Sequence, residues 1–198
     1  MSTSSTPRPK RMLPEQRERA ILDAAVALAR QSGIAGLTVR TVAAAAGVTP
    51  ALVAHYRPSM DAFVADVFGA IVGAEREEVM AAGRAEPGLR ARITRIVGTL
   101  LDGDRDDVTL VWVQAWAAGA RNEVLAERVR LEMDHWQHDL DAVVAEGVVA
   151  GEIPAAQAEG AAWLLLATVD GMNAHSLVKW APEDRAELAR RTVAAVLG

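Results

Sequence analysis

The ten residues from Gly47 to Tyr56 constrain the fold more than any other part of this sequence. Gly47 follows a short apolar helix pattern, and glycine favours the left-handed conformation that ends a helix, because it has no Cβ to clash. Two residues later, the Thr49 hydroxyl can cap the next helix, and Pro50 suits the first helical position, where no backbone donor is needed. The pattern predicts two helices, over 38–46 and 50–56, joined by a tight turn. This is the geometry of a helix-turn-helix, whose second helix lies in the major groove of DNA.

Helical periodicity continues along the rest of the chain, without a strand pattern or an internal repeat. The hydrophobic fraction is 51% but the aromatic fraction only 4%, and a composition rich in Ala, Val and Leu suits closely packed helices. We expect an all-α protein of about nine helices, with a small N-terminal bundle of three helices and a larger bundle behind it. The expected helices cover about 14–31, 38–46, 50–56, 59–82, 88–101, 107–119, 122–150, 155–180 and 182–197.

Charge is distributed unevenly along the sequence. The formal net charge of −5 is unusual for a protein that binds a polyanion. Residues 1–60, however, hold eight basic and three acidic residues, a net of +5, whereas the remainder holds 13 basic and 23 acidic ones, a net of −10. A basic segment joined to an acidic body favours local binding to phosphate groups. The alternative is a chance fluctuation of solvated charge.

Composition argues against several classes of site. The chain has no cysteine, so disulfides, thiolate metal sites and cysteine nucleophiles are excluded. The N-terminus is polar and basic, and the longest apolar run, 161–169, is too short to cross a bilayer. We therefore expect a cytoplasmic protein that does not bind a membrane. His135 and His138 have a spacing that can place two imidazoles together, but no third ligand can be placed beside them, so we expect no metal site and no cofactor.

Two sets of residues carry a resemblance to a known family. The first set lies in the first 65 residues or so: Ile21–Ala25, Gly33, Thr38–Ala43, Ala46–Thr49, Val53, His55, Tyr56, Pro58 and Ser59. In this set the sequence resembles the TetR family of bacterial transcriptional regulators. The second set is Val111–Trp116, Glu146–Ile153 and Ala161–Gly171. In this set the sequence is more weakly similar to the BetI-like branch of that family.

This resemblance implies a homodimer, paired through its last two helices, that binds a palindromic operator in double-stranded DNA until an unknown small-molecule inducer enters the C-terminal domain. It implies a DNA-binding domain at 13–60 and a ligand-binding and dimerisation domain at 61–198. Residues 1–12 are rich in Ser, Thr, Pro and basic residues with little to bury, so we expect a disordered basic arm there. The alternative role for the apolar residues of the last two helices is an intramolecular core.

Three positions depart from the family pattern. The family usually has an aromatic residue where Arg57 stands and a phosphate-contacting lysine where Met60 stands, and Ala54 replaces a frequent tyrosine. Arg57 either supplies the missing cation or belongs to a differently packed bundle.

The outward residues of the helix-turn-helix are candidate DNA contacts. Hydroxyls and backbone donors at the start of the 38–46 helix can hold phosphate. Small and apolar side chains on the next helix suit thymine methyl groups, and His55 suits a base or a phosphate. Tyr56 either contacts phosphate through its hydroxyl or packs into the bundle. The candidates are Thr38, Arg40, Thr41, Thr49, Pro50, Ala51, Leu52, His55, Tyr56 and Arg57.

All five tryptophans lie in the second half of the chain. A tryptophan stripe either fills a core or walls a ligand cavity, and a cavity needs apolar walls with a few polar groups. We predict a cavity in the larger bundle, with Gln114, His135 and His138 as further polar candidates. Its predicted walls are Trp112, Trp116, Met133, Trp136, Trp163 and Asn173.

A ligand-responsive repressor is favoured over two alternatives. An enzyme is not expected, because the sequence has no nucleophile elbow, phosphate loop or carboxylate pair at catalytic spacing. A helical protein-interaction module is the other alternative, and the basic N-terminus and the Thr49–Pro50 helix start argue against it. The helix over 59–82 links the two domains, so we expect it to transmit the effect of the ligand to the DNA-binding domain.

Overall fold

A computed structural model describes residues 13–180 and 183–198, and in these residues it contains α-helices, two short 3-10 helices and no strand. The expected all-α fold is confirmed, and most helices begin and end within a few residues of the expected bounds. The elements are α1 (Pro14–Ser32), η1 (Ile34–Gly36), α2 (Val39–Ala46), α3 (Pro50–Tyr56), α4 (Met60–Arg84), α5 (Leu89–Leu100), η2 (Gly103–Arg105), α6 (Asp106–Gly119), α7 (Glu123–Val149), α8 (Ala155–Ala158), α9 (Ala161–Ser176) and α10 (Arg185–Leu197).

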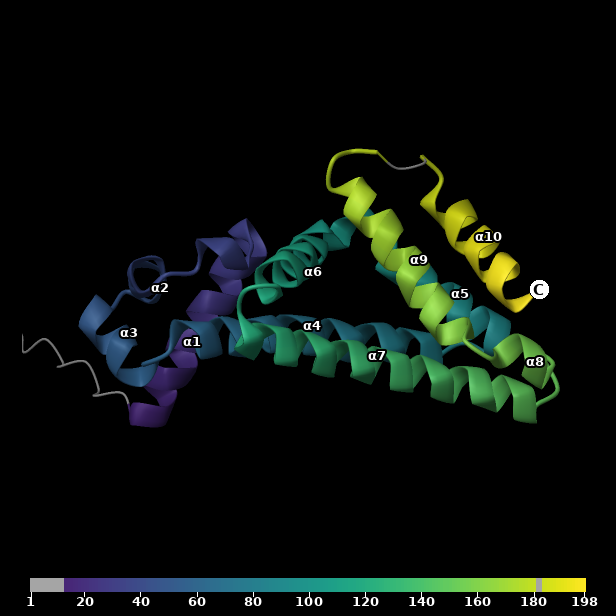
Figure 1. The fold of residues 1–198 in the computed structure, drawn as a ribbon, viewed down its shortest axis with the longest axis horizontal. Coiled ribbons are helices and arrows are strands. Elements are labelled where there is room, and N and C mark those ends of the chain that lie inside the picture. The colour runs from purple at the N-terminus through teal and green to yellow at the C-terminus, as the bar shows by residue number, and fades with distance from the viewer. Residues whose placement is uncertain (1–12, 181–182) are drawn as a thin grey trace, which may run out of the picture.

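Two long helices, α4 and α7, run side by side and connect the two ends of the molecule (Figure 1). The small helices α1 to α3 gather at one end. At the other end α5 packs on both long helices, α8 and α9 pack on α7, and α10 packs on α5, α8 and α9. Helix α6 lies between the two groups (Figure 1). The helix-turn-helix is therefore held at one end of the α4–α7 pair.

The buried side chains form two hydrophobic cores. The N-terminal core joins α1 to α3 not only to the first half of α4 but also to α6 and the start of α7, so the small bundle is not packed separately from the larger one. The C-terminal core lies among α4, α5, α7, α9 and α10. Trp112 of α6 packs against both. Members of the N-terminal core include Ile21, Ala25, Val42, Val53, Phe63, Phe68, Val108, Val111, Ala115 and Leu125.

The single helix expected over 155–180 is wrong in its bounds. The chain forms the short α8, turns at Gly160 and only then enters α9, which ends at Ser176. Gly160 has a φ of 71° and stands just before α9 in the left-handed conformation, which glycine adopts without steric cost. The periodicity of apolar residues continues through this turn, so the sequence pattern alone does not reveal it.

The predicted helix start at Pro182 and the predicted basic arm at 1–12 lie outside the described residues. The last helix as described begins at Arg185, where the Asp184 side chain caps it by accepting from the backbone N–H of Glu187 over 2.8 Å. None of the described helices is both long and apolar enough to cross a membrane.

Candidate DNA-binding surface and ligand cavity

The two helices of the helix-turn-helix are held by helix caps, of which the sequence predicts those at Gly47 and Thr49. The Thr38 hydroxyl accepts from the backbone N–H of Thr41, and the Thr41 hydroxyl accepts in turn from the N–H of Thr38. Gly47 ends α2 in the left-handed conformation, with a φ of 64°. The Thr49 hydroxyl then accepts from the N–H of Leu52, and Pro50 is the first residue of α3. Local capping thus fixes the angle at which α3 leaves the turn.

Most of the candidate DNA contacts are exposed in the structure. Leu52 and Tyr56 are half-buried, and Tyr56 packs against the N-terminal core with its ring 5.2 Å from that of His55. Val53 lies in the core, as expected. The Thr41 hydroxyl is also used inside the domain, because it donates to the carbonyl of Gly36. The exposed candidates are Thr38, Arg40, Thr41, Thr49, Pro50, Ala51 and His55.

Arg57 lies inside the domain rather than on its outer surface. Its guanidinium pairs with Glu18 of α1 at 3.2 Å and with Asp66 of α4 at 3.1 Å, and its side chain is only 17% exposed. It also stacks over the Phe63 ring at 4.9 Å. This geometry supports the packing role for Arg57 and not the substitute for a phosphate-binding lysine. Met60 packs against the same core, so neither position offers a free cation.

A cavity of about 270 Å³ lies among α4, α5, α6, α7 and α9. Each of the six side chains predicted to wall a ligand site lines it, although they come from three different helices. Apolar ligands gain from such walls because indole rings bury large areas. The lining residues are Glu75, Leu100, Thr109, Trp112, Trp116, Met133, Asp134, Trp136, Gln137, Trp163, Leu166, Ala167, Val169, Asp170 and Asn173.

The charged lining of the cavity is entirely acidic. Glu75, Asp134 and Asp170 line it, and none of its described lining residues is Lys, Arg or His. None of these three carboxylates is among the residues that the sequence predicts to wall the cavity. Glu75 had a usable signal, since it lies between Ile71 and Val79 on the apolar stripe of α4.

Burial changes the protonation of two of these carboxyl groups. Desolvation raises the pKa of Glu75 from its ordinary 4.5 to about 7, and the nearby Arg105 and Trp112 side chains offset part of this rise. Desolvation likewise raises the pKa of Asp170 from 3.8 to about 7. A carboxylate in an apolar wall is costly unless a cation or hydrogen-bond donor stabilises it. Both groups are therefore poised to gain from a positively charged ligand.

Three further polar candidates are not among the lining residues. Gln114 lies on another face of α6 and its amide oxygen accepts from the backbone N–H of Ala35, at 3.0 Å. His135 lies 3.4 Å from the Glu132 carboxylate, and neither it nor His138 lines the cavity. Among the described residues, no group of three acidic or histidine side chains is arranged to hold a metal ion.

Comparison with known proteins agrees with this arrangement. Residues 21–67 match the family model of bacterial regulatory proteins of the tetR family, and residues 89–198 match the model of the C-terminal domain of BetI-type transcriptional repressors. The HTH-type transcriptional regulator BetI of Rhizobium meliloti (strain 1021) is 28% identical over 174 residues, which cover 88% of this chain and 84% of that protein.

Solved structures share the fold. A TetR-family transcriptional regulator from Rhodococcus sp. superposes with a TM-score of 0.78 at 22% identity, covering 92% of this chain and 98% of that one. A transcriptional regulator from Saccharomonospora viridis in complex with choline gives 0.76 at 20% identity, covering 91% and 95%.

Proposed function

Since this chain belongs to the TetR family of bacterial transcriptional regulators and has a BetI-type C-terminal domain, we propose that it is a repressor released from a palindromic operator by an organic cation. The N-terminal helices through α3 bind the DNA, and the tryptophan-lined cavity in residues 61–198 binds the cation. The observation that carries the ligand class is the lining itself, in which three carboxylates stand among four tryptophans without a basic side chain.

Electrostatics and shape both support a cation in this cavity. The face of an indole ring attracts a positive charge, and the attraction increases when both partners are removed from water. Glu75 and Asp170 add negative charge on two sides of the same space. A neutral or anionic ligand would leave these groups unpaired or repelled. In this proposal the acidic groups serve recognition rather than catalysis.

An unpaired donor suggests a second feature of the ligand. The Trp116 indole N–H is buried and finds no hydrogen-bond partner among the described residues. A buried donor left unpaired costs about 1–3 kcal/mol, so a ligand oxygen that accepts from it would gain affinity. Choline combines a quaternary ammonium with a hydroxyl, and the structural neighbour from Saccharomonospora viridis binds choline. Choline is therefore the first probe.

On the DNA side, we propose that Thr38, Arg40 and Thr41 bind phosphate at the start of α2. Thr49, Pro50, Ala51, Leu52 and His55 would face the groove from α3. We leave Arg57 out, because it pairs within the domain. Tyr56 keeps its phenolic hydroxyl as a phosphate donor while its ring packs on the core.

A two-fold dimer would present two α3 helices to half-sites about one helical turn apart. We propose that α9 and α10 form its interface. Leu164, Ala167 and Gly171 follow one another at helical spacing on the exposed face of α9. Among the described residues, no neighbouring atom lies within 4 Å of a Cβ placed on Gly171, so this part of the chain does not account for a glycine there, whereas a second helix packed closely against α9 would.

The test has two stages. Selection from a random duplex library with the purified full-length protein should enrich a palindrome, and absence of enrichment by folded protein would contradict DNA binding. Choline should then quench or shift tryptophan fluorescence and release the selected duplex. Its neutral carbon isostere, in which a tert-butyl group replaces the trimethylammonium, should bind at least about tenfold more weakly, since each 1.4 kcal/mol of lost attraction is tenfold.

Two variants assign the ligand to the cavity. Asp170→Asn should weaken choline binding and leave the neutral isostere unaffected, because it removes charge at constant shape. Glu127→Gln, on the exposed surface of α7, removes one charge elsewhere and should change neither. Equal binding of choline and its isostere by the unmodified protein would contradict an organic cation as the ligand class.

A further inference from the structure

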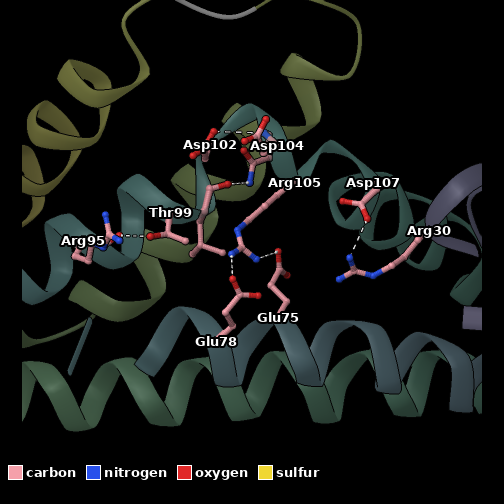
Figure 2. A network of polar contacts seen from close by, with 11 residues as sticks. Arg30, Glu75, Glu78, Arg95, Thr99, Asp102, Asp104, Arg105 and Asp107 are labelled. Atoms are coloured by element: carbon pink, nitrogen blue, oxygen red, sulfur yellow. Dashed lines mark hydrogen bonds and ion pairs between the residues drawn. The ribbon is translucent and has the colours of Figure 1, made fainter. Parts of the chain in front are cut away.

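The carboxylate of Glu75 faces a second partner besides the cavity. Its side chain is 5% exposed, and one oxygen lies 3.9 Å from the guanidinium of Arg105. The other terminal nitrogen of Arg105 lies 2.7 Å from Glu78, one turn further along α4 (Figure 2). Arg105 therefore bridges a buried carboxylate and a carboxylate that is 68% exposed. If Arg105 lost its contact with one of these carboxylates, it would remain paired with the other.

Arg105 also stands at the start of α6. It is the last residue of η2 and the residue just before α6, so a movement of its side chain acts directly on the first turn of that helix. Two residues further, Asp107 pairs with Arg30 of α1 at 3.3 Å (Figure 2). Near the other end of α6, Gln114 accepts from the backbone of Ala35. Polar contacts thus join the start of α6 to α4 through Arg105, and α6 to the DNA-binding domain through Asp107 and Gln114.

The body of α6 connects these contacts to the cavity. Trp112 and Trp116 line the cavity, and Trp112 also meets Phe68 edge to face at 4.9 Å. On the remaining face, Val111 and Ala115 are buried in the N-terminal core with α1 and α4. Because packed cores shift as units rather than deforming continuously, a displacement of α6 is carried to the residues packed on it.

We propose that Arg105 couples the cavity to the DNA-binding domain: a bound cation replaces Arg105 as the partner of Glu75, Arg105 withdraws to Glu78, and α6 shifts against α1 and η1. This mechanism rests on the proposed function, because it requires a cationic ligand in the cavity. The helix expected to transmit the signal was α4, which links the domains in sequence. The ion pairs assign that role to α6 together with α4.

The exchange is physically reasonable because one buried carboxylate cannot retain two cations at full strength. The free energy that Arg105 gains from Glu75 falls when a ligand ammonium neutralises the same charge. Glu78 keeps the guanidinium paired, so the exchange leaves no buried unpaired charge, which would be strongly unfavourable. A ligand shifts the equilibrium only by its differential affinity for the two states, and competition for Glu75 supplies that difference.

A double-mutant cycle without any ligand tests the contact. Arg105→Gln and Glu75→Gln each remove one side of the pair and should weaken binding of the selected operator duplex at least threefold in fluorescence anisotropy. The double variant should weaken it by the same factor as either single variant, because all three lose the same contact. Arg130→Gln is the matched control: Arg130 pairs with Glu123 on the outer surface of α7, and its loss should leave operator binding unchanged.

Two results would overturn the proposal: unchanged operator binding in both single variants, or a double variant whose loss is the product of the two single losses. Melting temperatures of each variant separate a general loss of folding from a loss of coupling. Glu75→Gln keeps the size of the side chain and removes a buried charge, so it is the variant expected to remain folded.

A second measurement adds the ligand. With choline as probe, Arg105→Gln should bind it severalfold more tightly than the unmodified protein, because the competing cation is gone. The ratio of operator affinities without and with choline should fall towards one, since the Arg105–Glu75 contact that the ligand would break is already absent from this variant. If the unmodified protein does not bind choline, the proposed ligand class is at fault, and the ligand-free cycle still decides the role of Arg105.

Discussion

The side-chain amide of Gln114 and the backbone N–H of Ala35 form a hydrogen bond of 3.0 Å between α6 and η1. It joins the helix that carries two cavity tryptophans to the loop that precedes the helix-turn-helix. The loop reaches α6 because Gly33 has no side chain: a Cβ there would collide with the amide of Gln114. The pair shows how closely the DNA-binding domain is docked on the ligand-binding domain.

Gly33→Ala should therefore destabilise the protein by about 2–4 kcal/mol. Gly33 has a φ of 77° and a ψ of 170°, a region that is essentially restricted to glycine and costs other residues about 1–3 kcal/mol. The Gln114 amide, at the end of a flexible side chain, can move away from the new Cβ, but it then loses its hydrogen bond to Ala35, which adds about 1 kcal/mol. Urea unfolding measures the loss.

Gly73→Ala is the matched control. Gly73 lies within α4, and no atom lies within 4 Å of the position that a Cβ would take, so alanine there should be neutral or stabilise by up to about 1 kcal/mol. Equal unfolding midpoints for Gly33→Ala and the unmodified protein would show that the loop can leave α6 without cost.

Arg57→Gln should reduce stability without changing the salt dependence of DNA binding. The two ion pairs and the contact with Phe63 together suggest a loss of about 1–2 kcal/mol. A phosphate contact, in contrast, contributes about 0.9 to the slope of log K against log salt.

Arg40→Gln provides the comparison, because Arg40 is exposed at the start of α2. Loss of the Arg40 charge should reduce the magnitude of the slope of log K against log salt by about 0.9. The stability of the protein should stay nearly unchanged. A salt dependence that is also weakened in Arg57→Gln would instead show that Arg57 contacts a DNA phosphate.

The stability of the protein should fall as the pH rises from about 4.5 to 7. In this range the unfolded chain releases the proton of Glu75 while the folded protein retains it, because burial raises the pKa of Glu75 to about 7. The unfolded state then binds fewer protons, so the free energy of unfolding decreases with rising pH, by up to about 3 kcal/mol from this group.

Glu75→Gln should flatten this part of the profile, leaving the contribution that Asp170 makes in the same direction. Urea unfolding of both proteins at pH 5 and pH 8 gives the comparison. The same decrease in the two proteins would mean that Glu75 is ionised at pH 5 in the folded state.

Leu164→Glu should convert the proposed dimer to monomers and weaken operator binding at least tenfold, because a charge would be buried in the α9 interface. Leu164 is 50% exposed in the single chain. Leu131→Glu makes the same change at a leucine of α7 that is 45% exposed, and it should leave the mass unchanged in sedimentation equilibrium. A dimeric Leu164→Glu protein would remove α9 from the interface.

Local sequence signals were sufficient for the helix-turn-helix. Gly47, Thr49 and Pro50 act on their own neighbours within a few residues. The predicted roles of Gly47 and Thr49 as helix caps, and of Pro50 as the first helical residue, follow from the chain order and are confirmed. The turn at Gly160 was missed, because apolar spacing continues on both sides of it and only the backbone conformation reveals the break.

The sequence by itself determined which side chains are apolar enough to surround a cavity and where the helix-turn-helix begins and ends, since both depend on residue type and short-range spacing. Only the tertiary structure decided that Glu75 and Asp170 share that cavity and that Arg57 pairs inside its domain. It also decided that Gln114 contacts η1 rather than the cavity. These partners come from helices far apart in the chain, and burial and pairing of charge depend on distances in space that no local pattern encodes.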